Sequence, residues 1–182
     1  MKVLAQTGVA MAACFLGFLF YASFQVAPAP AGPALLAEHM MEALAPSAIS
    51  TLGMIALCYV FQFMQSAAIW TALEQAKADA IRDKKPAPKR FDLKYGNTKY
   101  TRTVDRTVAN MMEQMPCALV STGLYALFVN AQLGSRLGWL WIFFRALYPH
   151  VYRRGPPMLF CSTMPGYFIV LYCVVGVAKQ VI

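Results

Sequence analysis

The stretch "RTVDRTVANMMEQMP" (residues 102–116) places charged and amide side chains at the start of a run that then becomes wholly apolar. Arg106, Asn110 and Glu113 are spaced i, i+4 and i+7, so on a helix they line one face over about two turns, roughly 10 Å of depth. A carboxylate at the centre of a membrane span costs about 2.5–3.5 kcal/mol on insertion scales, so it should face the bundle interior and meet a partner. The stretch therefore predicts a polar face inside an all-helical membrane protein.

The rest of the sequence has the composition of an integral membrane protein. Of the 182 residues, 59% are hydrophobic and 13% are charged, and the mean hydropathy is +0.49. Apolar runs of about 20 residues, the length that crosses a hydrocarbon core, recur along the chain. They predict five spans: Val3–Val26, Ile49–Leu73, Val108–Val129, Leu137–Val151 and Met158–Val177. Turn-like polar stretches at Asn130–Arg136 and Tyr152–Pro157 are expected to limit the short fourth run.

The N-terminal run has two interpretations. Lys2, an apolar stretch and then "APAPAGPA" resemble a signal peptide with a cleavage site. A retained anchor is favoured because the run is longer than a usual signal core and prolines crowd the candidate site. The connector Ala27–Pro46 is then expected to be a lumen-side or outer-side loop, with one amphipathic turn around "LLAEHMMEAL".

The basic residues predict the orientation in the membrane. Ten of the sixteen Lys and Arg residues lie between Lys77 and Arg106. Five spans put this loop, Lys2 and the Arg153–Arg154 turn on one side, and Arg136 and Lys179 on the other. By the positive-inside bias, the basic side faces the cytosol, or the matrix or stroma of an organelle. The membrane is expected to be that of the endoplasmic reticulum or of an organelle. Because the loop lacks the interleaved aromatic residues of a nucleic-acid surface, we expect it to face lipid headgroups and bind no nucleic acid.

Neither the cysteines nor the histidines suggest a metal site or a disulfide framework. The five cysteines lie in apolar runs, are odd in number and form no C-x-x-C pair, so they are expected to behave as small buried hydrophobes. His39 and His150 are far apart in the sequence. No Gly-rich phosphate loop, Ser-His-Asp set or H-E-x-x-H helix is present.

The fourth run offers a partner face for residues 106–113. In "RALYPHVY" the polar residues Arg145, Tyr148 and Tyr152 are spaced i, i+3 and i+7. Antiparallel pairing from the shared side matches the two faces as follows: Arg106 with Tyr152, Asn110 with Tyr148, and Glu113 with Arg145. This predicts a deep Glu113–Arg145 ion pair below a polar cleft. The cleft suits a small zwitterionic ligand, although the same groups could serve only to hold two helices in register.

Both faces resemble motifs of the membrane-associated proteins in eicosanoid and glutathione metabolism (MAPEG), which include microsomal glutathione transferases and leukotriene C4 synthase. "RTVANMMEQMP", from Arg106 to Pro116, is similar to that family's R-x-x-x-N-x-x-E-x-x-P. "RALYPHVYRRGPP", from Arg145 to Pro157, is similar to its R-x-x-Y-x-x-x-Y-x-x-G-x-P. The order and separation of the motifs also resemble the family's, over residues 48–180.

The resemblance implies a fold, a cofactor and an assembly. It implies subunits of four helices each that assemble as a homotrimer, with glutathione bound between neighbouring subunits. The expected fold is therefore all-α and integral to the membrane: a MAPEG-like four-helix domain over residues 48–182, preceded by an extra transmembrane helix and Pro-rich connector over residues 1–47. By resemblance, six residues would hold glutathione: Arg106, Asn110, Glu113, Arg145, Tyr148 and Tyr152.

The sequence departs from the family's enzymes at one functional position. Those enzymes carry an arginine seven or eight residues beyond the second tyrosine, where it stabilises the glutathione thiolate, but this chain has Leu159 and Phe160. A thiol of pKa about 8.5 needs nearby positive charge to ionise at neutral pH. Arg153 and Arg154 are the candidate substitutes, and Ser162 is a candidate hydroxyl near the site.

Two function classes follow from the sequence. One is a glutathione transferase or peroxidase that acts on lipophilic electrophiles arriving through the bilayer. The other is a non-catalytic MAPEG-derived scaffold, either a lipid-binding partner or an accessory subunit of a larger membrane complex. The missing arginine and the extra N-terminal run favour the second class, while the motif in the fourth run and Ser162 favour the first.

Overall fold

The computed structural model describes residues 36–86 and 98–182, with side chains from residue 42 onward. This part of the chain forms helices and contains no strand. The helices are α2 (Leu36–Arg82), α3 (Lys99–Phe128), α4 (Ala131–Ala146), α5 (Tyr148–Arg154) and α6 (Phe160–Val181). The predicted span Val3–Val26 lies outside the described residues, so the extra N-terminal helix and the division at residue 47 stay predictions.

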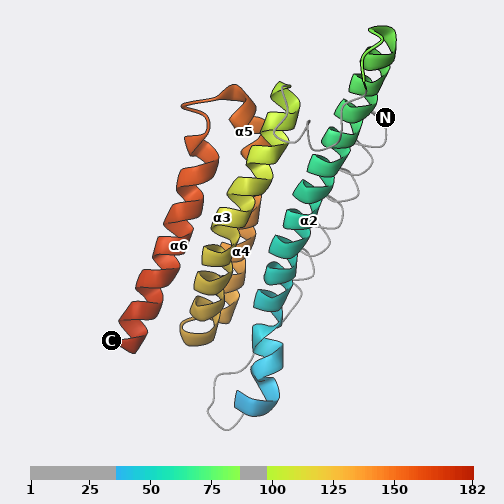
Figure 1. The fold of residues 1–182 in the computed structure, drawn as a ribbon. Coiled ribbons are helices and arrows are strands. Elements are labelled where there is room, and N and C mark those ends of the chain that lie inside the picture. The colour runs from blue at the N-terminus through green and yellow to red at the C-terminus, as the bar shows by residue number, and fades with distance from the viewer. Residues whose placement is uncertain (1–35, 87–97) are drawn as a thin grey trace.

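Helices α3 and α4 form the centre of the bundle, because each of them contacts the other four described helices. Figure 1 shows the four long helices side by side, with the end of α2, the start of α3 and the short α5 at one end of the bundle. The basic residues at the ends of these three helices therefore gather at the same end.

Local polar groups set where the helices begin and end. The Thr98 hydroxyl accepts from the Thr101 backbone N–H at 3.1 Å, and the Asn130 side chain accepts from the Leu133 N–H at 2.8 Å. Such caps satisfy backbone donors that have no partner within the first turn of a helix. Gly155, with a φ of 78°, ends α5 in a conformation that other residues rarely adopt.

Two predicted boundaries were wrong. The connector was expected to be a loop up to Pro46, but α2 already begins at Leu36 and continues through that proline. Of the turn expected over Asn130–Arg136, only Asn130 lies outside a helix, because Asn130 caps a helix that starts at Ala131. Capping residues resemble turn residues in sequence, since both supply side-chain hydrogen bonds to the backbone.

The fourth apolar run is also two helices rather than one. Helix α4 ends at Ala146, and α5 begins at Tyr148. Pro149 has no backbone N–H, so it cannot donate the bond that would continue α4, and proline is well accommodated in a first turn. Tyr148 and Tyr152 therefore lie on α5, whereas Arg145 lies in the last turn of α4.

Two helices in the described part are long and apolar enough to cross a membrane, α2 from Glu42 and α6. They include the predicted spans Ile49–Leu73 and, from Phe160 onward, Met158–Val177. Helix α3 has 30 residues with a polar first half, and α4 has 16, fewer than the roughly 20 that a full crossing needs.

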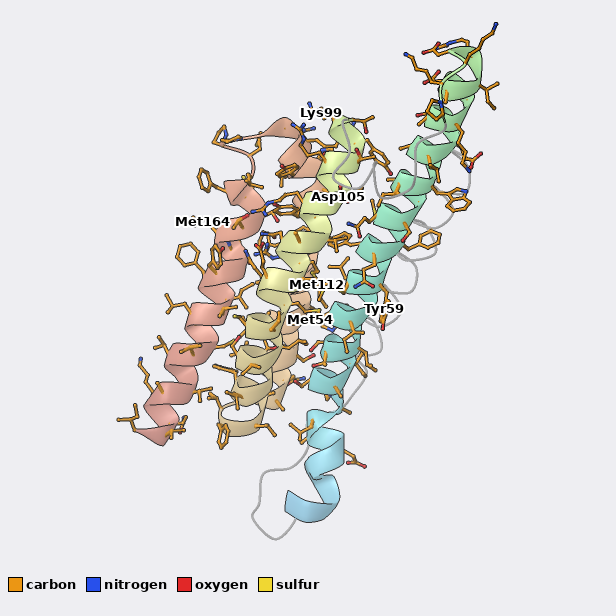
Figure 2. All side chains as sticks on the ribbon, viewed as in Figure 1. Met54, Tyr59, Lys99, Asp105, Met112 and Met164 are labelled. Carbon is orange, nitrogen blue, oxygen red and sulfur yellow. The ribbon has the colours of Figure 1, made fainter. Side chains whose placement is uncertain are left out.

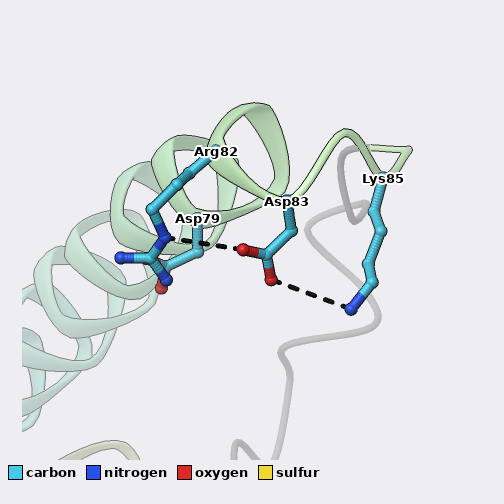
Figure 3. Close-up of polar contacts among 4 residues, drawn as sticks. All are labelled: Asp79, Arg82, Asp83 and Lys85. Atoms are coloured by element: carbon cyan, nitrogen blue, oxygen red, sulfur yellow. Dashed lines mark hydrogen bonds and ion pairs between the residues drawn. The ribbon is translucent and has the colours of Figure 1, made fainter.

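The end of α2 is a charged tip beyond the apolar part of the helix. Arg82 pairs with Asp79 at 3.1 Å and with Asp83 at 3.5 Å, and Lys85 lies 3.7 Å from Asp83 (Figure 3). All four side chains are largely exposed, so these pairs contribute little stability. Their charge instead favours a position in water, outside the hydrocarbon core.

Small residues allow α2 and α4 to pack closely. A Cβ at Gly138 would lie 2.8 Å from the Ser50 Oγ, and one at Gly53 would lie 2.9 Å from the Trp139 ring. Close helix packing through small residues is the usual contact in membranes, where lipid and side chain are equally apolar. Met54 lies in this core, whereas Tyr59 lies on the outer side of α2 (Figure 2).

Candidate functional site

A buried arginine is the centre of the candidate site. Arg145, 1% exposed, donates from Nη1 to Asn110 Oδ1 at 2.6 Å and from Nη2 to Gln114 Oε1. Its guanidinium also lies over the Trp141 ring, 5.3 Å from the centroid. None of its partners among the described residues is a carboxylate, so amide oxygens and an aromatic face stabilise the charge.

Gln114 connects this arginine to α6. Its Nε2 donates to the Tyr167 hydroxyl at 2.9 Å. A chain of hydrogen bonds therefore runs from Arg145 on α4, through Gln114 on α3, to Tyr167 on α6. It crosses three helices and ends on a half-exposed tyrosine.

Helix α6 lies directly against the guanidinium. A Cβ at Gly166 would be 2.5 Å from Arg145 Nη2, so only glycine permits this approach without displacement. The fully buried Ser162 donates to the Phe144 carbonyl at 2.6 Å, so it holds α6 to α4 and does not present its hydroxyl to a ligand. Two buried polar atoms next to this contact, Arg145 Nε and Thr163 Oγ1, have no hydrogen-bond partner in the described part.

A second, exposed group of predicted site residues lies nearer the basic end. Arg106 Nη1 is 3.6 Å from Glu113 Oε1, and the two side chains are 50% and 56% exposed. The buried Tyr148 hydroxyl lies near the guanidinium groups of Arg106 and Arg145. The Tyr148 ring stacks on Tyr152, with 5.7 Å between centroids. The exposed pair thus stands above a tyrosine stack and close to the buried arginine.

The predicted Glu113–Arg145 ion pair was wrong. Glu113 pairs with Arg106 on its own helix, and Arg145 bonds to Asn110 and Gln114. The predicted pairing of residues at equal depth is also shifted by about one helical turn. Asn110 bonds to Arg145 rather than to Tyr148, and Arg106 lies near Tyr148. Equal counting along the two runs failed because the chain breaks at Leu147, between α4 and α5.

The candidates for thiolate activation are exposed cations. Arg153 and Arg154 lie in the last turn of α5, and neither has a hydrogen bond or ion pair with the described residues. Leu159 and the exposed Phe160 stand at the start of α6, where the resemblance places an arginine. No cluster of potential metal ligands occurs in the residues that the structure describes.

Sequence reasoning missed Gln114, Gly166 and Tyr167. Gln114 is four residues after Asn110, so helical spacing placed it on the same face and could have identified it. Gly166 and Tyr167 gave no such signal, because their roles depend on how α6 packs against α3 and α4. Packing of that kind is a tertiary property that no spacing along one helix specifies.

The arrangement has two separate chemical properties. The exposed Arg106–Glu113 pair offers one cation and one anion, which can exchange their mutual contact for the carboxylate and ammonium groups of a zwitterion. The buried Arg145 and its amide partners hold α3, α4 and α6 in fixed positions beneath that pair.

A comparison with protein families finds one match. The family model described as MAPEG family matches residues 43–179, which is most of the chain. Neither the curated proteins nor the solved structures include a match.

Proposed function

Because the chain belongs to the MAPEG family, we propose that it binds glutathione beside the exposed Arg106–Glu113 ion pair and conjugates it to lipophilic electrophiles. Glutathione carries two carboxylates and one ammonium group. Arg106 would hold a carboxylate and Glu113 the ammonium, with Tyr152 alongside. The other predicted site residues would fix the positions of the helices that carry these groups: Asn110, Arg145 and Tyr148.

The observation that carries the proposal is the exposure of the Arg106–Glu113 pair. A pair of this kind is worth about 0–1 kcal/mol to the fold, so both charges remain available to a ligand at little cost. The buried Arg145 differs, because it is 1% exposed and both of its terminal nitrogens already donate to amide oxygens within the chain. In the family's manner, the site would be completed by a neighbouring copy in a homotrimer.

Glutathione binding tests this proposal. We expect purified protein in detergent to bind glutathione saturably in titration calorimetry, and Arg106→Gln to weaken binding by about tenfold or more, as for a lost charge-assisted hydrogen bond. Arg102→Gln is the matched control: it removes an exposed arginine one turn earlier on α3 that has no partner in the described part. Equal binding by wild type and Arg106→Gln, or equal losses in both variants, would contradict the proposal.

The second candidate is a non-catalytic scaffold or accessory subunit. The observation in its favour is the apolar pair Leu159 and Phe160 at the start of α6, which leaves thiolate activation to Arg153 or Arg154. Conjugation of glutathione to a standard electrophile, above the rate without protein, decides between the two. Saturable binding without turnover would favour a binding protein, and loss of turnover in Arg153→Gln or Arg154→Gln would identify the activating cation.

A further inference from the structure

The direction of the hydrogen bonds at Gln114 follows from the arginine. A guanidinium can only donate, so the Gln114 oxygen must face Arg145 and accept from Nη2. The amide nitrogen must then face Tyr167, which removes the usual ambiguity between the two ends of an amide. Since an amide nitrogen only donates, the Tyr167 oxygen accepts this bond.

The Tyr167 O–H is therefore still available as a hydrogen-bond donor. No acceptor for it occurs among the described residues, and the side chain is 50% exposed. Its neighbours on the same surface of α6 are large exposed apolar residues, among them Met164, Phe168 and Leu171. Tyr167 is seven residues into the apolar helix α6, about 10 Å from its start. A free donor at that depth faces the lipid phase, where an unmet hydrogen bond is unfavourable because no water can replace it.

We infer that the Tyr167 hydroxyl is a recognition donor for the carbonyl oxygen of a lipophilic substrate that reaches the site through the bilayer. This inference rests on the proposed function, because Gln114 links the hydroxyl to Arg145. Arg145 in turn lies near Tyr148, which is close to Arg106 of the proposed glutathione site. The substrate class is an α,β-unsaturated ketone with an aliphatic chain.

The reaction would use the donor where charge develops. Conjugate addition joins the glutathione sulfur to the β carbon, moves the C=C electron pair toward the carbonyl oxygen as an enolate, and returns the thiol proton to the α carbon. A positioned O–H that donates to that oxygen stabilises the enolate more than the ground-state ketone. Arg145 acts only through Gln114, as a positioning residue for the hydroxyl.

The first arm of the test measures binding without glutathione. The probe is 2-nonanone labelled with ¹³C at its unreactive carbonyl, added to the protein in nanodiscs of ether-linked lipids, which lack ester carbonyls. We expect an infrared carbonyl band at lower frequency, the signature of a hydrogen bond, that is present in wild type and absent in Tyr167→Phe. Tyr172→Phe, which removes another exposed phenol of α6, is the control and should keep the band.

Gln114→Glu tests the bond direction itself. The introduced carboxylate still accepts from Arg145 but can no longer donate to Tyr167, so the phenol should turn its proton toward the carboxylate. The ketone band should then disappear although Tyr167 is retained. Persistence of the band in this variant would overturn the inference.

The second arm measures turnover with glutathione for two electrophiles of similar length, non-3-en-2-one and 1-bromooctane. We expect Tyr167→Phe to lower kcat/KM for the enone by about tenfold or more, as for a hydrogen bond to a developing charge. The value for the bromide, which has no oxygen acceptor, should stay within about twofold of wild type, because the variant leaves the glutathione contacts unchanged. Equal losses for both electrophiles would overturn the inference.

The outcomes separate the two proposals. A Tyr167-dependent ketone band without any glutathione binding would refute the proposed function and support the recognition donor. Glutathione turnover without such a band would support the proposed function and refute the recognition donor. Loss of the band when ester lipids replace ether lipids would assign the hydroxyl to a lipid carbonyl, and a changed oligomeric mass in Tyr167→Phe would assign it to a subunit contact. Either result would overturn the inference.

Discussion

At the scale of single residues, Arg145 carries the strongest constraint in the described bundle. A buried cation is costly unless neighbouring groups stabilise it, and here two amide oxygens accept from the guanidinium and the Trp141 ring lies against it. Removing one partner leaves part of the charge unmet, whereas removing an exposed charge leaves nothing buried. The two pairs in this site, one buried and one exposed, should therefore respond very differently to substitution.

The partners of the buried and exposed charges give the first prediction. Asn110→Leu removes an acceptor from Arg145 and should lower the free energy of unfolding by about 1–3 kcal/mol or more. Glu113→Gln removes the partner of the exposed Arg106 and should change it by less than about 1 kcal/mol. Thermal unfolding in one detergent, followed by circular dichroism, measures both. A larger loss in Glu113→Gln than in Asn110→Leu would mean that the buried bonds do not stabilise the fold.

The close approach of α6 gives the second prediction. Gly166→Ala places a methyl group 2.5 Å from Arg145 Nη2, and displacing the buried guanidinium should cost about 1–3 kcal/mol in stability. Gly123→Ala is the matched control, because nothing lies within 4 Å of its added Cβ and alanine favours a helix interior. The control should unfold at the same temperature or higher. Similar unfolding temperatures for the two variants would refute the contact.

Thiolate activation gives the third prediction. Phe160→Arg adds a cation at an exposed position, lowers the pKa of a bound thiol from its usual value near 8.5, and so raises the thiolate fraction. The gain in conjugation rate should be largest below about pH 8 and vanish above the unperturbed pKa, where the thiol is ionised without help. Phe160→Gln controls for the loss of the aromatic ring. A gain that does not change with pH, or an equal gain in Phe160→Gln, would exclude an effect on thiol ionisation.

At the scale of elements, the apolar runs predicted the helices but not their ends. Runs of hydrophobic residues set the middle of α2, α3 and α6, because those residues must leave water. Pro46 did not end α2, although a proline cannot donate to the carbonyl four residues earlier. Packing holds this part of α2 in the bundle, because Ser135 on α4 donates to the Pro46 carbonyl at 2.6 Å. That contact comes from another helix and is invisible in the local sequence.

The candidate site was predicted in part for the same reason. The 3.6-residue repeat correctly placed Asn110 and Arg145 on facing sides of two helices, and they do bond. From Asn110, however, both Glu113 and Gln114 lie close to the same face, and the repeat alone cannot choose between them. The direction from which α4 approaches α3 makes that choice, and it selects Gln114.

The side of the bundle on which each helix ends gives the fourth prediction. In a cysteine-free background, Lys85→Cys after α2 and Arg136→Cys in α4 should react with an impermeant maleimide from opposite sides of sealed vesicles. The reason is that α3 carries the chain from the end of the bundle where α2 stops to the end where α4 starts, and the ten basic residues of 77–106 should stay on one side. Reaction of both from the same side would refute this topology.

At the scale of the whole molecule, much of the surface is apolar. Large hydrophobic residues are exposed along α2, α3 and α6, including Phe63, Val120 and Phe168. A patch of that extent on a soluble monomer would cause association, so lipid or other protein chains must cover it. The assembly state is therefore part of the function as well as of the fold.

The fifth prediction concerns that assembly. If the protein binds glutathione as proposed, native mass spectrometry from detergent should show three copies, and glutathione should raise the population of the trimer because it contacts two subunits. Arg102→Gln should show the same shift and Arg106→Gln should not. A monomer that co-purifies with unrelated subunits and ignores glutathione would support the scaffold role instead.

The length of α2 has a consequence for imaging. Its 47 residues rise about 70 Å, more than twice the thickness of a hydrocarbon core of about 30 Å. Small membrane proteins are hard to orient in electron micrographs because the detergent belt hides their outline. This helix continues past the ends of its neighbours (Figure 1), so side views should carry a rod-like landmark by which particle images can be aligned.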